Sequence, residues 1–507
     1  MFSIIKFRIL ERQKNLVIYL LTFLLLGAGR LHATDVDAAV EKALKLFNVP
    51  GAAVGIVVDD EIIYAKGFGT RKAGLKLPVS EHTLFPIASC TKAFTALILA
   101  QLVEENKLAF DDPVIKHIPE FCLLDPDVSS SLTIRDLLAH RTGIARHDPI
   151  WIVKQEEKLD ILKVLSHLES DCGLRQEYRY NNFMYAVAGM VIERVTKQSW
   201  EEAIASRILI PLEMMESNLC LEDLYRTENF SYPHAEIAGK VVEIPFRELR
   251  AINPAGGINC SILDLAKWVL AQLSDGANLI SKSTLQEMHT THMPLSTIPM
   301  PFYHEGCGLG WFTGKYYGYE WICHSGDIDG FASEVSFLPE EKIGIVILSN
   351  SGSDGRYLIN AVRNYIYDNL LPLPNEDPFN QTQMVRAFVK QDVERAMSEL
   401  KNYQDEIELT DYMGIYKHPA YGTVKVHQEN EQLYFSYGNY LIPLFARSPD
   451  VFAGQFDDLL YFGINPVVDF LFLKDESGKT CKLQIPFEGF RGSRPISFIK
   501  DNASNNF

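Results

Sequence analysis

The apolar positions near the start of the chain follow first a helical and then an extended period. In residues 35–47 they recur at the spacing of an amphipathic helix. Residues 52–58 and 61–68 are mostly apolar and are separated by the polar pair Asp59-Asp60, which is the pattern of two strands joined by a tight turn. We therefore expect a helix followed by a β-hairpin.

From residue 86 to about residue 301 the apolar period is mostly helical. The clearest predicted helices cover 89–105, Ile134–Leu138, Asn182–Thr196 and Ile262–Leu273. The predicted strands that follow cover 308–313, 321–325, 332–338 and Ile343–Ser349, and an amphipathic helix covers 354–371. These patterns predict an α+β domain, with one antiparallel sheet built from both ends of the segment, flanked by terminal helices and carrying a large helical insertion.

The pattern changes again after residue 372. Residues 373–407 are Pro-rich at first and then helical and charged, and we interpret them as a linker. The rest shows about eight short strand patterns, among them 423–427, 432–437, 467–473 and 496–499. The predicted domains are thus an α+β domain at 34–372 and a small β-rich barrel or sandwich at 408–500.

Composition and charge exclude several classes of protein. The chain has 507 residues, of which 47% are hydrophobic and 22% charged, so it is globular and long enough for two or three domains. A net charge of −17 repels phosphate backbones, which argues against nucleic-acid binding. The eight cysteines are scattered without a CxxC pair, which predicts no metal site, although one or two disulfides remain open. We expect no cofactor.

The N-terminus has the features of an export signal. Basic residues precede an apolar run at residues 16–29, which is shorter than the ~20 residues that span a bilayer. We therefore predict a signal peptide at 1–33, cleaved near Ala33, and an exported protein that is periplasmic or secreted. The alternative is an uncleaved segment that anchors the protein to the membrane.

A Ser-x-x-Lys motif provides the first candidate chemistry. It occurs three times, but only Ser89-Cys90-Thr91-Lys92 opens a strong predicted helix. A lysine three residues after a serine lies on the same helix face, and burial can leave its amine partly neutral, able to take the proton of the hydroxyl. Alone, the motif is more typical of a capping serine followed by an exposed lysine.

Two further motifs favour catalysis over that alternative. Tyr180-Asn181-Asn182 stands just before an apolar helix, where a tyrosine hydroxyl can relay a proton and an asparagine amide can bind a substrate amide. A second Tyr-x-Asn, at 437–439, is interpreted as a turn of the β-rich region.

The third motif, His324-Ser325-Gly326, ends a predicted strand, and its glycine allows a substrate backbone to approach closely. The similar triplet at 304–306 is expected to be a loop. Two histidine pairs, at 289 and 292 and at 140 and 147, lack further ligands at metal-binding spacing, so no metal site is predicted there.

On these motifs the chain resembles the serine β-lactamase and DD-peptidase superfamily, closest to class C β-lactamases and their esterase and D-aminopeptidase relatives. The likeness covers roughly residues 38–371 and has His-Ser-Gly in place of the usual Lys-Thr-Gly. Supporting stretches lie at 108–113, 134–143 and 254–257. The tail resembles the lipocalin-like domain appended to some of these hydrolases.

The resemblance implies an acyl-enzyme mechanism without a metal. Ser89 would attack a carbonyl, and Lys92 with Tyr180 would move the proton to the leaving group. The N–H groups of Ser89 and Asp327 would bind the oxyanion. The remaining implied substrate-binding residues are Asn182, Ser325 and Gly326, with His324 supporting Tyr180 and the leaving end.

The histidine of the third motif changes the expected substrates. A lysine there is a fixed cation, whereas His324 should be mostly neutral at pH 7 and so attract a substrate carboxylate weakly. We therefore expect a serine hydrolase of carboxypeptidase, D-aminopeptidase or esterase type, acting on small peptides, amides or esters and at best a weak β-lactamase. The alternatives are a non-catalytic protein that binds peptidoglycan peptides, an efficient class C-type β-lactamase, and a scaffolding role. Assembly into a homo-oligomer is left open.

Overall fold

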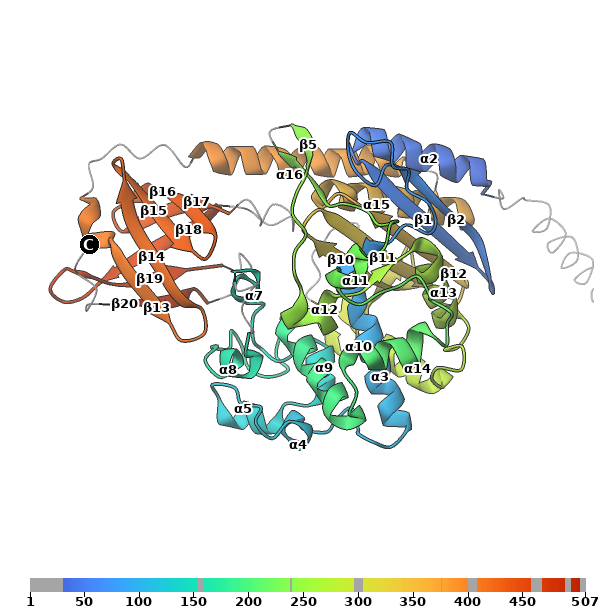
Figure 1. Ribbon diagram of the computed structural model, residues 1–507, viewed down its shortest axis with the longest axis horizontal. Helices are drawn as coiled ribbons and strands as arrows, with labels where there is room; N and C mark the ends of the chain where they lie inside the picture. The colour runs from blue at the N-terminus through green and yellow to red at the C-terminus, as the bar shows by residue number, and fades with distance from the viewer. Residues whose placement is uncertain are drawn as a thin grey trace, which may run out of the picture.

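The computed structural model describes residues 31–153, 159–237, 239–295, 304–374, 376–399, 408–456, 467–487 and 494–501. The predicted export signal at 1–33 therefore lies almost wholly outside the described residues. Within those ranges no helix has both the length and the apolar character needed to cross a membrane. Figure 1 shows a larger body of mixed helices and strands beside a smaller, all-β one.

The larger body is built on one antiparallel sheet. Among the described residues it has eight strands in the order β2-β1-β12-β11-β10-β9-β8-β7. These are β1 (Gly51–Val58), β2 (Glu61–Gly69), β7 (Met293–Pro294), β8 (His304–Cys307), β9 (Phe312–Tyr316), β10 (Tyr319–Ile328), β11 (Phe331–Leu338) and β12 (Ile343–Ser349). Strand β1 pairs with β12, with Ala52 opposite Ser349, so the first and the last strand of the domain lie side by side in the sheet. The predicted sheet is confirmed.

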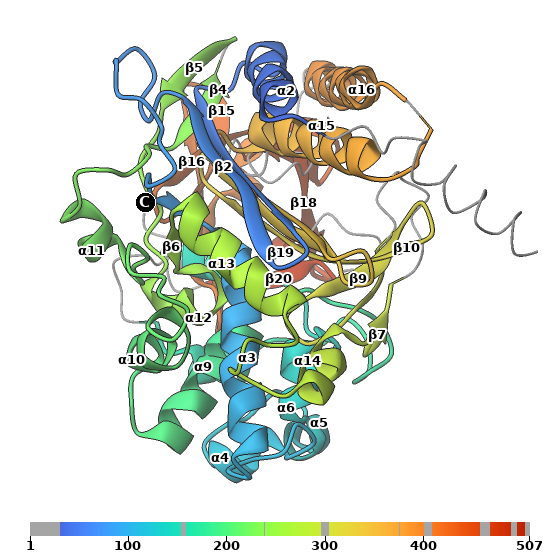
Figure 2. The same ribbon diagram turned by 90° about the vertical axis from the view of Figure 1, so that its right-hand side faces the viewer.

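Helices cover both faces of this sheet (Figure 2). The terminal helices α2 (Ala33–Leu46) and α15 (Ser353–Leu370) cover one face and bury a core that includes Phe47, Leu358 and Val362. Helices α3 (Thr91–Glu104) and α13 (Ile262–Leu273) lie on the other side. Helix α3 is buried almost all round, as expected of an apolar helix at the centre of a domain.

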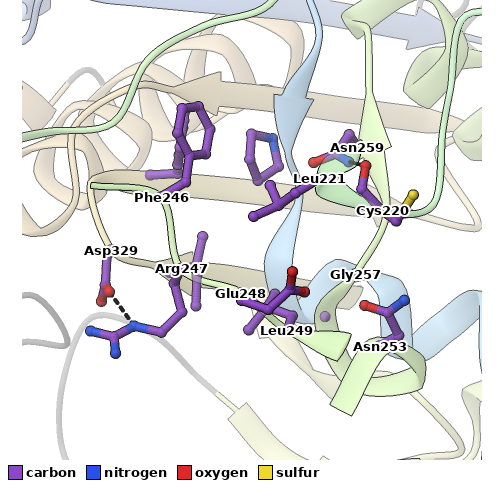
Figure 3. A pocket seen from close by; sticks show the side chains of 14 residues that line it. Cys220, Leu221, Phe246, Arg247, Glu248, Leu249, Asn253, Gly257, Asn259 and Asp329 are labelled. Atoms are coloured by element: carbon purple, nitrogen blue, oxygen red, sulfur yellow. Dashed lines mark hydrogen bonds and ion pairs between the residues drawn. The ribbon is translucent and has the colours of Figure 1, made fainter. Parts of the chain in front are cut away.

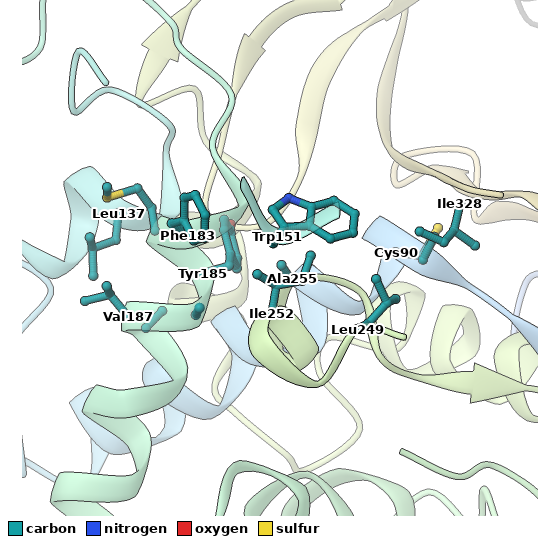
Figure 4. Packing of buried hydrophobic residues seen from close by; sticks show 14 of the residues in the cluster. Cys90, Leu137, Trp151, Phe183, Tyr185, Val187, Leu249, Ile252, Ala255 and Ile328 are labelled. Carbon is teal, nitrogen blue, oxygen red and sulfur yellow. The ribbon is translucent and has the colours of Figure 1, made fainter. Parts of the chain in front are cut away.

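The remaining helices form the insertion between the first two and the last strands. They are α4 (Val114–His117), α5 (Pro126–Ser131), α6 (Ile134–Leu138), α7 (Pro149–Val153), α8 (Ile161–Leu165), α9 (Asn182–Thr196), α10 (Trp200–Ile204), α11 (Leu221–Tyr225), α12 (Asn253–Gly256) and α14 (Lys282–His289). Two short strand pairs accompany them, β3 (Phe85–Pro86) with β6 (Asn259–Cys260) and β4 (His234–Ile237) with β5 (Lys240–Glu243). In Figure 4, Phe183 and Tyr185 of α9 pack with Trp151 of α7 and Ala255 of α12, so one core links the elements that surround the first two motifs.

Two local predictions in this body were wrong. Residues 308–313 are not one strand, because Gly310 has a φ of +82° and the chain turns there between β8 and β9. The triplet at 304–306 is not a loop but part of β8, an irregular strand that pairs with β9 through a register shift between His304 and Gly306. Alternation of side chains is weak in such an irregular strand, so the sequence pattern misses it.

Residues of the expected linker form helix α16 (Pro378–Glu399). Its first turn is fixed to the larger body, because Phe379 is buried in the core beneath α15 and its ring lies 5.7 Å from that of Tyr365. Further along, Arg386 forms ion pairs with Asp354 and Glu236. The helix therefore lies along the larger body for part of its length (Figure 1).

The smaller body is a closed barrel, which decides between the two architectures expected from the sequence. In the part of the chain that the structure describes, its eight strands follow one another in chain order. They are β13 (Gly414–His418), β14 (Gly422–Glu429), β15 (Gln432–Tyr437), β16 (Tyr440–Ser448), β17 (Val451–Gln455), β18 (Val467–Lys474), β19 (Thr480–Ile485) and β20 (Ile496–Lys500). The second Tyr-x-Asn, at 437–439, is the turn between β15 and β16, as predicted.

Candidate active site

Ser89 lies at the start of the central helix α3. It occupies a single 3₁₀ turn, Ala88–Cys90, that leads into the helix, and its side chain remains partly exposed to the cleft. Ala88, directly before it, has a φ of +46°, a left-handed conformation that non-glycine residues seldom adopt. Such backbone strain is found disproportionately at functional sites. The sharp turn presents the hydroxyl at the surface of an otherwise buried element.

Lys92 is fully buried one turn further on. Its Nζ lies 3.1 Å from Ser89 Oγ, 2.8 Å from Asn182 Oδ1 and 2.8 Å from the carbonyl oxygen of Ala255. Burial lowers the pKa of Lys92 well below its ordinary value, and the nearby guanidinium of Arg146 lowers it further. The amine is therefore prepared to accept a proton, and the oxygen nearest to it that carries one is that of Ser89.

Tyr180 completes the set around the nucleophile. Its hydroxyl donates a hydrogen bond to Ser89 Oγ at 2.7 Å, and its ring lies 4.8 Å from Lys92 Nζ. The helix cap behind it fixes this position, because Asn181 caps α9 by accepting from the N–H of Met184. Burial raises the pKa of the Tyr180 phenol, and the guanidinium of Arg146 acts in the opposite direction. The phenol is thus protonated at rest.

A short charged segment forms a further wall that sequence reasoning missed. The carboxylate of Asp148 accepts hydrogen bonds from Asn182 Nδ2 at 2.9 Å and from Arg146 Nε at 2.7 Å. The guanidinium of Arg146 also lies 4.7 Å from the centre of the Tyr180 ring. This segment therefore orients Asn182 and places one cation near both Lys92 and Tyr180.

The third motif stands opposite Ser89 on β10. Gly326 packs so closely on the carbonyl of Ile87 that a Cβ at this position would lie 2.1 Å from it, which explains the glycine. Below the strand, Arg356 donates to the Gly326 carbonyl at 2.9 Å and pairs with Asp327 at the same distance. The end of β10 is thus fixed next to the segment that carries the nucleophile.

His324 lies deeper in this strand than its expected role requires. It is 3% exposed, its Nδ1 is 2.6 Å from the Ser325 carbonyl oxygen, and its ring packs on Phe312. Burial and the nearby charge of Lys92 lower the pKa of His324 to about 3, so the imidazole is neutral at pH 7, as the sequence suggests. Within the described residues no hydrogen bond joins His324 to Tyr180, whose hydroxyl donates to Ser89.

A pocket lies near the nucleophile. Its cavity volume is only about 20 Å³, room for about one water molecule, and Pro86 and Gly256 on its wall lie close to Ala88. Figure 3 shows Leu221, Phe246 and Leu249 around it, with Arg247 and Asp329 paired at one side. Glu248 and Asn259 also line it, so the wall mixes apolar and polar groups, and its size leaves room only for a small group of a molecule held at Ser89.

Comparisons with known proteins show the family of the chain. The family model described as Beta-lactamase matches residues 36–365. The chain belongs to the Beta-lactamase family. A relative from Aspergillus violaceofuscus (strain CBS 115571), the unguisins hydrolase ungD, is 30% identical over 431 residues, which is 77% of this chain and 76% of the relative. Family membership and likeness to a named hydrolase make the chain a hydrolase.

Solved structures support the two-part fold. The octameric penicillin-binding protein homologue from Pyrococcus abyssi aligns with a TM-score of 0.61 at 24% identity, over 93% of this chain and 100% of that one. The crystal structure of SurE aligns with a TM-score of 0.56 at 20% identity, over 92% and 98%. Both alignments extend beyond the hydrolase domain, so the fold of this Beta-lactamase-family chain is shared along nearly its whole length.

The structure brings most of the predicted site residues of this hydrolase together and separates the histidine pairs. Nδ1 of His140 accepts from the Asn181 N–H at 3.1 Å, whereas His147 is 2.9 Å from the hydroxyl of Tyr421 in the barrel. His289 packs against Trp311. Among the described residues no group of three or more His, Cys, Asp and Glu side chains could hold a metal ion. All eight cysteines fall in the described ranges and none is disulfide-bonded.

Proposed function

We propose that this Beta-lactamase-family protein is a serine hydrolase that acts through a Ser89 acyl-enzyme. The hydrogen bonds that converge on Ser89 Oγ, from Tyr180 at 2.7 Å and Lys92 at 3.1 Å, support this proposal most directly. A nucleophile, a base and a second proton carrier in contact form the arrangement that activates a hydroxyl. A capping serine beside an exposed lysine would show neither the burial of Lys92 nor the contact with Tyr180.

In acylation, the proton of Ser89 passes to the neutral Lys92 amine as Oγ bonds to the substrate carbonyl carbon. The negative charge that develops on the carbonyl oxygen is stabilised by the N–H groups of Ser89 and Asp327. As the tetrahedral intermediate collapses, the leaving nitrogen or oxygen departs and takes a proton by way of Tyr180. Water then attacks the acyl-enzyme ester by the reverse route, which releases the acid and restores Ser89.

We propose small peptides, amides or esters as substrates, with β-lactam hydrolysis weak at best. A buried, neutral His324 offers no fixed positive charge to a substrate carboxylate. In the small pocket near Ser89, Arg247 is paired with Asp329, so its charge is already neutralised and attracts a substrate carboxylate weakly. The likeness to a hydrolase of unguisins also supports turnover of substrates other than β-lactams.

The test is labelling of the purified full-length protein with a fluorophosphonate, followed by peptide mapping. Ser89 should carry the label, Ser89→Ala should abolish it, and Lys92→Ala should slow it by at least ~10²-fold. Ser398→Ala, in the unrelated Ser-x-x-Lys at 398–401, is the matched control and should label normally. Label on another residue, or label that survives Ser89→Ala, would contradict the assignment.

A panel of nitrocefin, nitrophenyl esters and D- and L-amino peptides then distinguishes the substrate classes. Turnover of esters or peptides with slow nitrocefin hydrolysis is expected. Brisk nitrocefin turnover would favour a β-lactamase, and a flat response to every substrate together with absent labelling would favour a protein that only binds peptides.

A further inference from the structure

The segment at residues 144–153 lies between the hydrolase cleft and the barrel. His147, at its middle, has a φ of +52° and is 2% exposed. Its neighbours Arg146 and Asp148 contact the candidate catalytic residues, whereas His147 contacts the barrel. A left-handed conformation in a histidine is uncommon and must be held by its surroundings.

On the cleft side this segment reaches the base through two hydrogen bonds. Asp148 Oδ1 accepts from Asn182 Nδ2 at 2.9 Å, and Asn182 Oδ1 accepts from Lys92 Nζ at 2.8 Å. Trp151 Nε1 donates to the same carboxylate oxygen at 2.7 Å, so Asp148 is fixed by its own segment as well. A displacement of the segment would therefore change the position and charge environment of Lys92.

On the barrel side the middle of the segment meets the barrel through a buried pair. The hydroxyl of Tyr421 is 2.9 Å from Nδ1 of His147, and both side chains are buried. Tyr421 is fixed within the barrel, because its ring stacks on Phe487 at 5.5 Å and packs edge-on against Phe498. The barrel thus presents one rigidly held hydroxyl to the middle of the segment.

Two further contacts join the barrel to the same wall of the cleft. Gly438, in the turn between β15 and β16, approaches α7 so closely that a Cβ there would lie 2.3 Å from Cγ1 of Val153. The backbone N–H of Arg494 donates to Asp171 at 3.0 Å, in the stretch that leads to Tyr180. In Figure 1, α7 adjoins the barrel.

The interior of the barrel is filled with side chains. Phe435, Phe452 and Phe470 are each at most 1% exposed, and the aromatic rings around them contact one another. These residues fill the described interior of the barrel and leave no ligand cavity among them. We therefore expect any effect of the barrel on hydrolysis to come from the contacts of its outer face.

We infer that Tyr421 is a positioning residue for hydrolysis, through which the barrel holds the 144–153 segment so that Asp148 and Arg146 adjust the Ser89–Lys92–Tyr180 site. This inference rests on the proposed function. The barrel is then a structural part of the active site, although none of its described residues hydrogen-bonds to Ser89, whose hydroxyl bonds to Lys92 and Tyr180. A small shift of the segment is enough to affect rate, because catalytic geometry tolerates little misplacement.

The test compares two tyrosine-to-phenylalanine variants of the full-length protein. Tyr421→Phe removes the hydroxyl that meets His147 and keeps the ring stacked on Phe487. Tyr416→Phe removes an equally buried barrel hydroxyl, which donates to the Tyr412 carbonyl at 2.7 Å, within the smaller body. The second-order rate of fluorophosphonate labelling at Ser89 is measured for both from pH 5 to 10, beside their thermal midpoints.

We expect Tyr421→Phe to lower the labelling rate by about tenfold and to displace its pH profile, while Tyr416→Phe labels like the wild type. The groups that shape this profile around Lys92 are Arg146, Asp148, Tyr180, His140 and His324. A wild-type rate and profile in Tyr421→Phe would overturn the inference. Failure of the wild type itself to label would instead overturn the proposed function.

A second variant approaches the same contact from the other side. His147→Asn keeps a residue that tolerates a left-handed backbone but is too short to reach the Tyr421 hydroxyl. If Tyr421 acts through His147, the double variant should be no slower than the slower single variant. Effects that multiply would show that Tyr421 acts by another route. If Tyr421→Phe does not fold, a normal rate and profile in His147→Asn would overturn the inference.

Discussion

The amine of Lys92 and the side-chain oxygen of Asn182 are held 2.8 Å apart in the buried centre of the hydrolase domain. The carbonyl oxygen of Ala255 is also 2.8 Å from the amine. These two oxygens occupy two directions around Nζ, and Ser89 Oγ lies in a third. A neutral amine can donate to the first two and direct its lone pair at the Ser89 hydroxyl, whereas an ammonium can donate to all three. The same geometry therefore serves the base before and after it takes the proton.

Replacing Arg146 should raise the pKa of the base, Lys92. The guanidinium lowers the pKa of Lys92, and the Asp148 carboxylate that it neutralises raises it. Arg146→Gln removes the cation that lowers the pKa and leaves the Asp148 carboxylate without its neutralising partner. Both changes favour the ammonium form of Lys92. We expect the rise of the Ser89 labelling rate with pH to move to higher pH, with a slower rate at pH 7.

The matched control is Arg207→Gln. Arg207 pairs with Glu105 and its side chain is 22% exposed, against 25% for Arg146, but it lies outside the cleft. Its variant should keep the wild-type profile. An unshifted profile in Arg146→Gln, or a shift to lower pH, would mean that Arg146 does not act on Lys92.

Removing the Tyr180 hydroxyl should slow acylation without unfolding the domain. Tyr180→Phe deletes the donor that lies 2.7 Å from Ser89 Oγ, and we expect labelling to fall by about 10²-fold. Tyr316→Phe deletes a hydroxyl at the same distance from its partner, Asp368, and should label normally. Comparable labelling rates in the two variants would show that Tyr180 transfers no proton during acylation.

Much of the fold follows from local patterns, and the failures have local causes. Helices Asn182–Thr196 and Ile262–Leu273 begin and end where the sequence predicts, because a capping side chain precedes a long apolar stripe in each. The strand expected at 308–313 fails because glycines interrupt it and the turn at Gly310 depends on close packing against α3. Closure of the barrel depends on tertiary contacts between distant strands, and the spacing of strands in the sequence does not distinguish a barrel from a sandwich.

The candidate site divides in the same way. Ser89 and Lys92 share one helical turn, so their proximity follows from spacing. The role of Asp148 depends on a contact with Asn182 made across 34 positions of irregular chain, and no periodicity indicates it. The contact of His147 with Tyr421 spans 274 positions and two domains. A histidine in a charged loop was the only sequence feature that could have drawn attention to it.

Buried histidines should make the fold sensitive to acid. Burial lowers the pKa of His147, His289 and His324 to about 3, whereas unfolded histidine titrates near ~6.5. Between these values the unfolded chain binds more protons, so stability is complete above ~6.5 and falls as the pH drops toward 3. Each histidine adds at most about 1.4 kcal/mol per pH unit to this slope. Urea midpoints measured from pH 4 to 7 test it.

His289→Gln is the informative variant for that slope. His289 lies away from the cleft, and its Nε2 is 3.2 Å from Gln272 Oε1, a contact that a glutamine amide can keep. The variant should therefore lose part of the pH dependence while keeping most of the stability at pH 7. An unchanged slope would mean that His289 is protonated equally in the folded and unfolded chains.

His324→Lys tests why antibiotic substrates are expected to be poor. A lysine would supply the fixed cation that neutral imidazole lacks, so substrates with a carboxylate should gain about 1 kcal/mol in binding, or several-fold in KM. Neutral esters should gain nothing. The new charge would also lie near Lys92 and so lower the pKa of that base further, which keeps the amine neutral at pH 7. The measurement is the ratio of nitrocefin to neutral-ester turnover.

His324→Gln separates charge from the loss of the imidazole. It removes the ring that packs 5.1 Å from Phe312 without adding a cation, so it should lower both activities alike and leave the ratio near that of the wild type. A ratio that rises in His324→Lys alone would show that carboxylate recognition depends on charge at this strand. A flat ratio in both variants, or a wild type that already hydrolyses cephalosporins briskly, would mean that His324 substitutes adequately for lysine.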